Sequence, residues 1–396
     1  MKKLTWRHTG RFFRAAFWMD FSSATFIVAL PYFALKLGGD SLDLGILGAA
    51  RGVAYLVACI PVALLADRAR RNRLIGIAAV GIALALVLTS SADKLWHLYF
   101  GAVLWAISLS FFWPSLFAWL GDAHDPANLA RATGVVNLGW SSGSIVGSLL
   151  SGWLFQIAIP LPFFIALIGV CLARFAPAHK EDQGDPQTEI SSTESASPGT
   201  KRRLAACWLG NTAVCCLIGL MTGVFPKLGT TIGIESGIFG LMVAALGLAR
   251  TGVFWASFQG ARAPHKWSLS VIAQIVSAAL IATLATASNH LWLGLVYIFI
   301  GITLGFVYSL SLYASLADVG SRGLKSGLHE AALLGGILLG TVGGGVVANR
   351  FGLRTPYIPA AAVVLCLVVV QITLHLSASH AEKKHRQEDA ESTDIS

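Results

Sequence analysis

The chain has 396 residues, of which 55% are apolar and only 12% are charged, whereas a soluble domain is usually about 25% charged because charged side chains cover its surface. This composition excludes a secreted disulfide scaffold, a disordered chain and an ordinary cytosolic enzyme, and it indicates a protein that crosses a membrane several times. The net charge of +9 then reflects the orientation of the spans rather than a nucleic-acid partner, because Lys and Arg gather on the cytoplasmic side of membrane proteins.

Twelve mainly apolar runs follow one another along the chain, and a helix needs about 20 such residues to cross a bilayer. Because lipid offers the backbone no hydrogen-bond partners and no run alternates with a period of two, the runs predict helices. The predicted spans are residues 12–35, 43–66, 74–91, 95–120, 133–156, 160–176, 204–226, 237–260, 267–288, 291–316, 327–348 and 356–377.

A polar segment divides these spans into two sets of six. Residues 177–203 have almost no apolar content and are rich in acidic residues, Ser, Thr and Pro, a composition typical of disorder. The prediction is an N-terminal six-helix bundle over 1–176, a cytoplasmic disordered linker over 177–203, a C-terminal six-helix bundle over 204–378, and a charged, disordered cytoplasmic tail over 379–396.

The positions of the basic residues predict the orientation. With the N-terminus in the cytoplasm, 22 of the 29 Lys and Arg residues fall on the cytoplasmic side and 5 on the other side. This bias predicts an all-α, multi-pass protein of the cell inner membrane with twelve helices and both termini in the cytoplasm.

The two sets of helices resemble each other in sequence. Phe112–Asp122 (FWPSLFAWLGD) and Tyr308–Asp318 (YSLSLYASLAD) agree at five positions, and Arg51 in the second span matches Arg250 in the eighth. Four glycines of the fifth span also fall on four glycines of the eleventh. We therefore expect two repeats in the same orientation, related by an axis along the membrane normal, with a substrate site between them near the middle of the bilayer.

The segment after the second span, ALLADRARRN over residues 63–72, resembles the loop pattern Gly-x-Leu-Ala-Asp-Arg-x-Gly-Arg-Arg of the major facilitator superfamily, with Ala and Arg at the two glycine positions. Together with the two sets of six spans, it makes nearly the whole chain similar to that family. The resemblance implies that Asp67, Arg68 and Arg71 form gating contacts between the halves at the cytoplasmic face. The alternative is a basic loop that only follows the charge bias.

The fifth span, GWSSGSIVGS over residues 139–148, resembles the family's antiporter motif, although Ser144 stands at the proline position. The other interpretation is close packing of helices through small residues spaced four apart. The family's Arg of the fourth span is absent, because residues 98–118 carry no charge. The expected packing glycines are Gly139, Gly143, Gly147, Gly336, Gly340 and Gly344.

Charged side chains inside a membrane are costly and usually functional, and the predicted spans contain four clear candidates. Asp20 is a candidate for proton coupling or for binding a cationic substrate, since burial favours the protonated carboxyl; the alternative is a paired structural acid. Glu330 is a second proton-coupling candidate or an acid that stabilises a helix start. Arg51 and Arg250 form a candidate clamp for a carboxylate or phosphate, or else pack between the halves beside an acid such as Glu330.

Further substrate-binding candidates are Phe112, Trp113, Asn137 and Tyr308. Aromatic rings with a few polar groups suit sugars or amphipathic organic molecules, although ordinary packing is the alternative for each ring. The sequence contains no nucleophile–base arrangement, no phosphate-binding loop and no metal-ligand spacing, so we expect no enzyme, no cofactor, no metal and no ATP-driven pump.

The resulting hypothesis is a secondary transporter that moves a small organic solute by alternating access. Its partners are the small-molecule substrate, the lipid bilayer and a coupling proton, and no oligomer is required. Two alternatives stay open: a protein of the same fold that exports sugars or drugs, and a membrane sensor that transports nothing.

Overall fold

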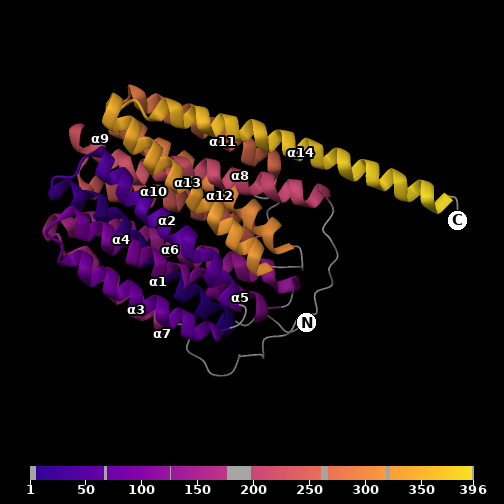
Figure 1. Ribbon diagram of the computed structural model, residues 1–396, viewed down its shortest axis with the longest axis horizontal. Coiled ribbons are helices and arrows are strands. Elements are labelled where there is room, and N and C mark those ends of the chain that lie inside the picture. Colours follow the sequence, from indigo (N-terminus) through magenta and orange to yellow (C-terminus); the bar gives the residue numbers. More distant parts are fainter. Residues whose placement is uncertain are drawn as a thin grey trace.

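The computed structural model describes residues 6–66, 69–124, 126–175, 198–259, 266–317 and 322–394. Within these ranges the chain forms helices and no strand, and the helices lie side by side in one bundle (Figure 1). In chain order the elements are α1 (Trp6–Lys36), α2 (Ser41–Ala66), α3 (Arg71–Ser90), α4 (Leu95–Ser110), α5 (Trp113–Asp122), α6 (Pro126–Ile157), α7 (Leu161–Phe175), α8 (Pro198–Gly219), the π-helical turn η1 (Leu220–Val224), α9 (Phe225–Thr231), α10 (Ser236–Phe258), α11 (Trp267–Ala282), the 3-10 turn η3 (Thr283–Ala285), α12 (His290–Ala317), α13 (Arg322–Phe351) and α14 (Tyr357–Asp394).

The outer surface of the bundle is apolar. Ten helical segments of the described chain are long and apolar enough to cross a membrane, α7 is a shorter apolar helix, and the Gly- and Ser-rich α6 is 32 residues long. Large aliphatic side chains stand exposed on it, including Val57 at 70% and Leu248 at 65%. Such a continuous apolar surface is unstable in water, so these side chains face lipid, as the composition predicts.

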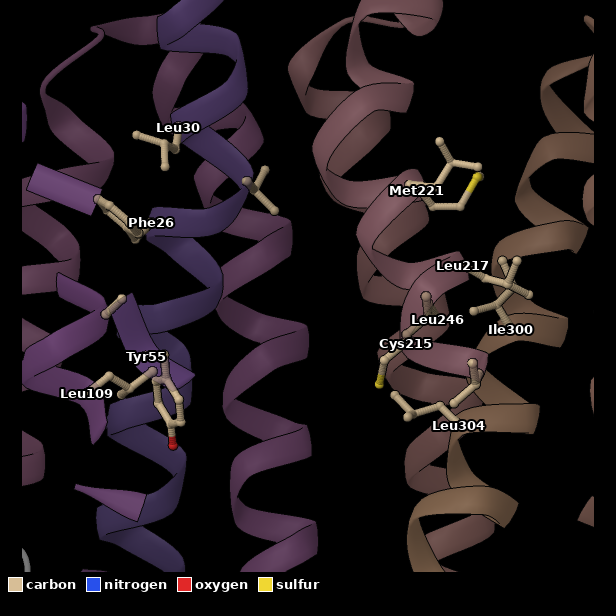
Figure 2. Close-up of a cluster of buried hydrophobic side chains, with 14 of the residues drawn as sticks. Phe26, Leu30, Tyr55, Leu109, Cys215, Leu217, Met221, Leu246, Ile300 and Leu304 are labelled. Carbon is tan, nitrogen blue, oxygen red and sulfur yellow. The ribbon is translucent and has the colours of Figure 1, made fainter. Parts of the chain in front are cut away.

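Apolar cores form on both sides of the bundle. Figure 2 shows Phe26, Leu30, Tyr55 and Leu109 on helices of the first half of the chain. It shows Leu217, Met221, Leu246, Ile300 and Leu304 on helices of the second half.

Two helices, α6 and α13, pack across the boundary between the first and second halves of the chain. α6 packs on α1 and on α10, and α13 packs on α8 and on α2. Glycines allow these close approaches: Gly143 of α6 faces the Phe17 carbonyl of α1, and Gly340 of α13 faces the Cys216 carbonyl of α8. Helix backbones in direct contact leave no room for even a methyl group.

The predicted span 95–120 is interrupted. α4 ends at Ser110 and α5 begins at Trp113, with Pro114 in its first turn. Proline lacks a backbone N–H and restricts the residue before it, so the helix restarts at this point. The predicted span 204–226 is likewise interrupted by η1, directly before the short helix α9 that contains Pro226.

Two predicted boundaries differ from the structure. Helix α8 begins at Pro198, six residues before the predicted start at 204, and the rest of the predicted linker lies almost entirely outside the described residues. The predicted disordered tail is wrong over most of its length, because α14 continues to Asp394 and extends beyond the other helices (Figure 1). The tail contains neither Gly nor Pro, and its Ala, Glu and Lys residues favour a helix even without a continuous apolar run.

The glycine contacts predict a contrast between two neighbouring positions of α13. Gly340→Ala places a methyl group against the Cys216 carbonyl, whereas the same change at Gly343 meets open space. We expect Gly340→Ala to destabilise the protein by about 1–3 kcal/mol and Gly343→Ala to be neutral or stabilising, since alanine favours a helix more than glycine. The midpoint of thermal unfolding in detergent, at one scan rate, measures both. Equal midpoints for the two variants would contradict close packing at Gly340.

Candidate functional site

A cavity of about 240 Å³ lies in the centre of the bundle, between helices of the first and second halves of the chain. Its walls come from α1, α2, α4, α5 and α6 on one side and from α8, η1, α10, α12 and α13 on the other. Most of the lining is apolar or aromatic, with a few hydroxyl groups and four charged residues. A mainly apolar cavity with a few converging polar groups is the usual form of a site for a small organic ligand.

The four ionisable residues predicted inside the membrane all line this cavity: Asp20, Arg51, Arg250 and Glu330. They come from α1, α2, α10 and α13, which are far apart in the sequence. Two acids and two bases balance one another in charge, and a shared polar cavity reduces the cost of placing them at membrane depth. In the described part of the chain, no carboxylate oxygen lies within 4.0 Å of either arginine.

Arg250 is held in position from one side. Its Nε donates to Ser141 Oγ at 2.9 Å, and its guanidinium carbon lies 3.9 Å from the centre of the Trp140 ring. Ser141 is itself hydrogen-bonded to Thr251 Oγ1 at 2.7 Å. The Nη2 atom is buried without a hydrogen-bond partner among the described residues. A fixed guanidinium with a free N–H group is suited to bind an oxyanion.

Asp20 faces the same region from α1. Ser144 of α6 lies beside its carboxyl group, and the carboxyl interacts electrostatically with Arg250. It also interacts with Glu330 across the cavity. Protonation of Asp20 therefore changes the charge beside Arg250 directly, and protonation of Glu330 changes the charge that acts on Asp20.

Arg51 lies on α2, on the side of the cavity formed by the first half of the chain, whereas Arg250 lies on α10 of the second half. Its guanidinium carbon is 5.9 Å from the Trp105 ring centre, within cation–π range. The indole Nε1 of Trp105 is buried without a partner in the described chain. This wall therefore offers a second cation and a second free N–H donor.

The structure separates the other predicted binding residues into two groups. Trp113 and Tyr308 line the cavity, whereas Phe112 is fully buried and packs edge-on against Trp113, with ring centres 5.2 Å apart. Asn137 does not line the cavity either, and its Oδ1 accepts from Trp140 Nε1 at 3.1 Å. Asn137 thus orients the ring that stacks on Arg250.

The packing glycines and Arg71 do not line the cavity. Asp67 and Arg68 lie outside the described residues, and Arg71 is the first residue of α3. The glycines of α6 face the backbone or side chains of α1, and those of α13 face α8 and η1: Gly139, Gly143, Gly147, Gly336, Gly340 and Gly344.

Several lining residues were not among the predicted site residues. Trp140, Ser144 and Ser148 follow one another at intervals of four on α6, and Tyr55 is four residues after Arg51 on α2. Residues four apart share one face of a helix. Since Arg51 was a predicted site residue, the spacing could have identified Tyr55. On α6, the spacing could identify further lining residues only after one residue was known to line the cavity.

A buried polar cluster supports the wall at Tyr308. The Nδ1 of His329 accepts hydrogen bonds from Asn211 Nδ2 at 3.0 Å and Ser311 Oγ at 2.9 Å. The His329 ring packs edge-on against Tyr308, with centres 4.9 Å apart, and His329 directly precedes Glu330. The cluster connects α8, α12 and α13 immediately behind the cavity.

Comparison with known proteins identifies the family to which this architecture belongs. The sequence profile of the Major Facilitator Superfamily matches residues 12–321. The chain belongs to the Major Facilitator Superfamily. It is therefore a member of a family of membrane transporters rather than an enzyme.

Among curated members, the chain is 25% identical over 168 residues to a protein of Cupriavidus pinatubonensis named "Probable 4-methylmuconolactone transporter". The match spans 41% of this chain and 39% of that relative. Among solved structures, a bacterial homologue of the human lysosomal transporter Spinster has a TM-score of 0.69 at 14% identity, covering 96% of this chain and 98% of that one. The human organic anion transporter MFSD10 has a TM-score of 0.65 at 14% identity, covering 92% and 99%.

The cavity geometry predicts which serines of α6 meet the ligand space. Ser144 lines the cavity and Ser142, two residues away, does not. In a chain whose six natural cysteines are replaced, we expect a cysteine at 144 to react with a small negatively charged thiosulfonate, because the arginines attract it. A cysteine at 142 should react much more slowly. Labelling of both at the same rate, measured by mass spectrometry, would contradict the assigned lining.

Proposed function

We propose that this transporter moves a small organic anion across the cell inner membrane by alternating access, driven by a proton. The observation that carries the proposal is Arg250, which lines the central cavity, is fixed by Ser141 and Trp140, and has a buried Nη2 without a hydrogen-bond partner among the described residues. A carboxylate that accepts from Nη2 would satisfy this donor with a charge-assisted hydrogen bond. Arg51 supplies a second positive charge in the same cavity.

The walls support an anion with a flat apolar body. Trp105, Trp113, Trp140 and Tyr308 line the cavity beside the two arginines. Rings of this kind pack on planar or unsaturated organic groups. The name of the C. pinatubonensis relative, "Probable 4-methylmuconolactone transporter", and that of the human organic anion transporter agree with this substrate class.

We assign the proton-coupling role to Asp20, with Glu330 as the second acid. Asp20 interacts with Arg250, so an arriving carboxylate competes with it for the same cation. A proton on Asp20 removes the negative charge that would otherwise repel the arriving carboxylate. Substrate binding and protonation of Asp20 would thereby reinforce each other.

We infer that the moving parts are two six-helix repeats with both termini in the cytoplasm. The ends of α1 and α9 support the repeat, because Gly38 and Gly233 each follow the helix with a positive φ, +86° and +81°. The next helices begin three residues later, at Ser41 and Ser236. The packing of α6 on α1 and α10 also has its counterpart in the packing of α13 on α8 and α2.

At that same end of the bundle, contacts join the two halves. Tyr32 Oη donates to the Ile234 carbonyl at 3.4 Å, and Gln156 Nε2 donates to Glu235 Oε2 at 3.0 Å. The basic-residue bias predicts that this end faces the outer side of the membrane. In the proposed cycle these contacts break when the cavity opens outwards, and the family's loop at Asp67, Arg68 and Arg71 gates the cytoplasmic side.

The first test removes the cation. We expect Arg250→Gln to weaken binding of an organic anion about 10–100-fold, since a hydrogen bond to a charged group contributes about 1.5–3 kcal/mol. Binding of benzoate, 4-methylmuconolactone and the neutral benzamide to the purified protein measures the effect. Arg350→Gln, at an exposed helix end, is the matched control. An unchanged anion affinity in Arg250→Gln, or equal binding of benzoate and benzamide, would contradict the anion site.

The second test separates coupling from binding. In proteoliposomes, Asp20→Asn should abolish accumulation driven by a pH gradient while retaining exchange of labelled for unlabelled substrate, because the amide cannot carry a proton. Asp93→Asn changes an exposed acid at 72% exposure and should behave like the natural protein. Full pH-driven accumulation in Asp20→Asn would remove the coupling role, and loss of exchange as well would make Asp20 a binding residue.

A further inference from the structure

A groove with a volume of about 720 Å³ lies on the outer surface, between α3, α4 and the end of α7. It shares no lining residue with the central cavity. Neither α3 nor α7 contributes a residue to the central cavity, so this groove is separate from the proposed substrate site.

Two arginines occupy one end of this groove. Arg73 lies in the first turn of α3, and Arg174 is the penultimate residue of α7. Gly76, one turn beyond Arg73, leaves space for the Arg174 guanidinium, whose Nε would lie 3.4 Å from a Cβ at that glycine. Both cations therefore converge on the same face of α3 at the membrane-interface end of the groove.

Hydrogen bonds within the described chain leave N–H donors of these arginines unused. Arg174 Nη1 donates to Asn72 Oδ1 at 3.1 Å, and a guanidinium carries five N–H donors. No carboxylate oxygen lies within 4.0 Å of Arg73 or Arg174 among the residues that the structure describes. An oxyanion would complete this arrangement better than a neutral group.

The rest of the groove is aliphatic and faces outward. Ile77 and Val80 on α3 are 53% and 63% exposed, and Ile107 on α4 is 38% exposed. Val80 lies about 10 Å deeper along the helix than Arg73, at 1.5 Å per residue. A ligand that fits both ends must carry an anionic group at the interface and an apolar chain that points into the bilayer.

We propose that this groove binds one anionic phospholipid, with its phosphate between Arg73 and Arg174 and an acyl chain along Ile77, Val80 and Ile107. A basic pocket between membrane helices on the cytoplasmic side is suited to such headgroups. The apolar extension distinguishes a lipid from a free phosphate ion, which would meet only the arginines.

The test uses the full chain in detergent and counts bound lipid by native mass spectrometry. Phosphatidylglycerol should bind more tightly than phosphatidylcholine, and Arg73→Gln should weaken its binding about five-fold, the effect of one basic residue near an anionic headgroup. Arg70→Gln is the matched control, because this exposed arginine lies three residues earlier and does not line the groove. Val80→Trp should also weaken binding, by filling the site of the acyl chain.

Three results would overturn the proposal. Equal binding of phosphatidylglycerol and phosphatidylcholine would remove the role of charge. An equal loss in Arg70→Gln and Arg73→Gln would indicate general attraction to a basic surface. Competition by inorganic phosphate, together with normal binding in Val80→Trp, would indicate an anion site without a lipid chain. Because Arg73 is exposed, its substitution leaves the packing of α3 intact, and an unfolded variant does not obscure the result.

Discussion

The high free energy of a charge in hydrocarbon governs how this protein is built. The four charged residues that the sequence analysis selected inside the membrane all line the cavity between helices of the two halves of the chain. None of them could face lipid without a large penalty, so the helices that carry them must turn these faces inwards. The cavity is therefore a structural necessity for the charges and also the place where a charged ligand can compensate them.

Helix α6 combines packing and binding on adjacent faces. Gly139, Gly143 and Gly147 face α1, while Trp140 and Ser144 line the cavity. Neighbouring residues of a helix point about 100° apart. The glycines therefore face α1, while the residues that directly follow them, also spaced four apart, face the cavity. Close contact with the α1 backbone brings Ser144 near Asp20, and the neighbouring residues Trp140 and Ser141 hold Arg250 from α10. One helix thus connects the proposed proton carrier to the proposed anion site.

The outer helices that do not line the cavity lie against lipid. α3, α7, α11 and α14 contribute no lining residue to the central cavity, and much of their surface faces lipid. The proposed phospholipid groove lies on this outer layer, where basic residues at helix ends meet exposed aliphatic side chains. Inner helices therefore select a solute in the proposed mechanism, and outer helices contact the bilayer.

The sequence by itself determined the class of the fold and its charged residues. Apolar runs of sufficient length can only be helices in lipid, and Asp20, Arg51, Arg250 and Glu330 were evident because charges are rare in such runs. Tertiary structure decided what local pattern could not: which face of each helix points inwards, and hence that Trp113 lines the cavity while the adjacent Phe112 does not. It also decided the meeting of Arg250 with Trp140, which come from different halves of the chain. These outcomes depend on contacts between residues distant in the chain, because an apolar helix with no polar side has no periodicity that marks its buried face.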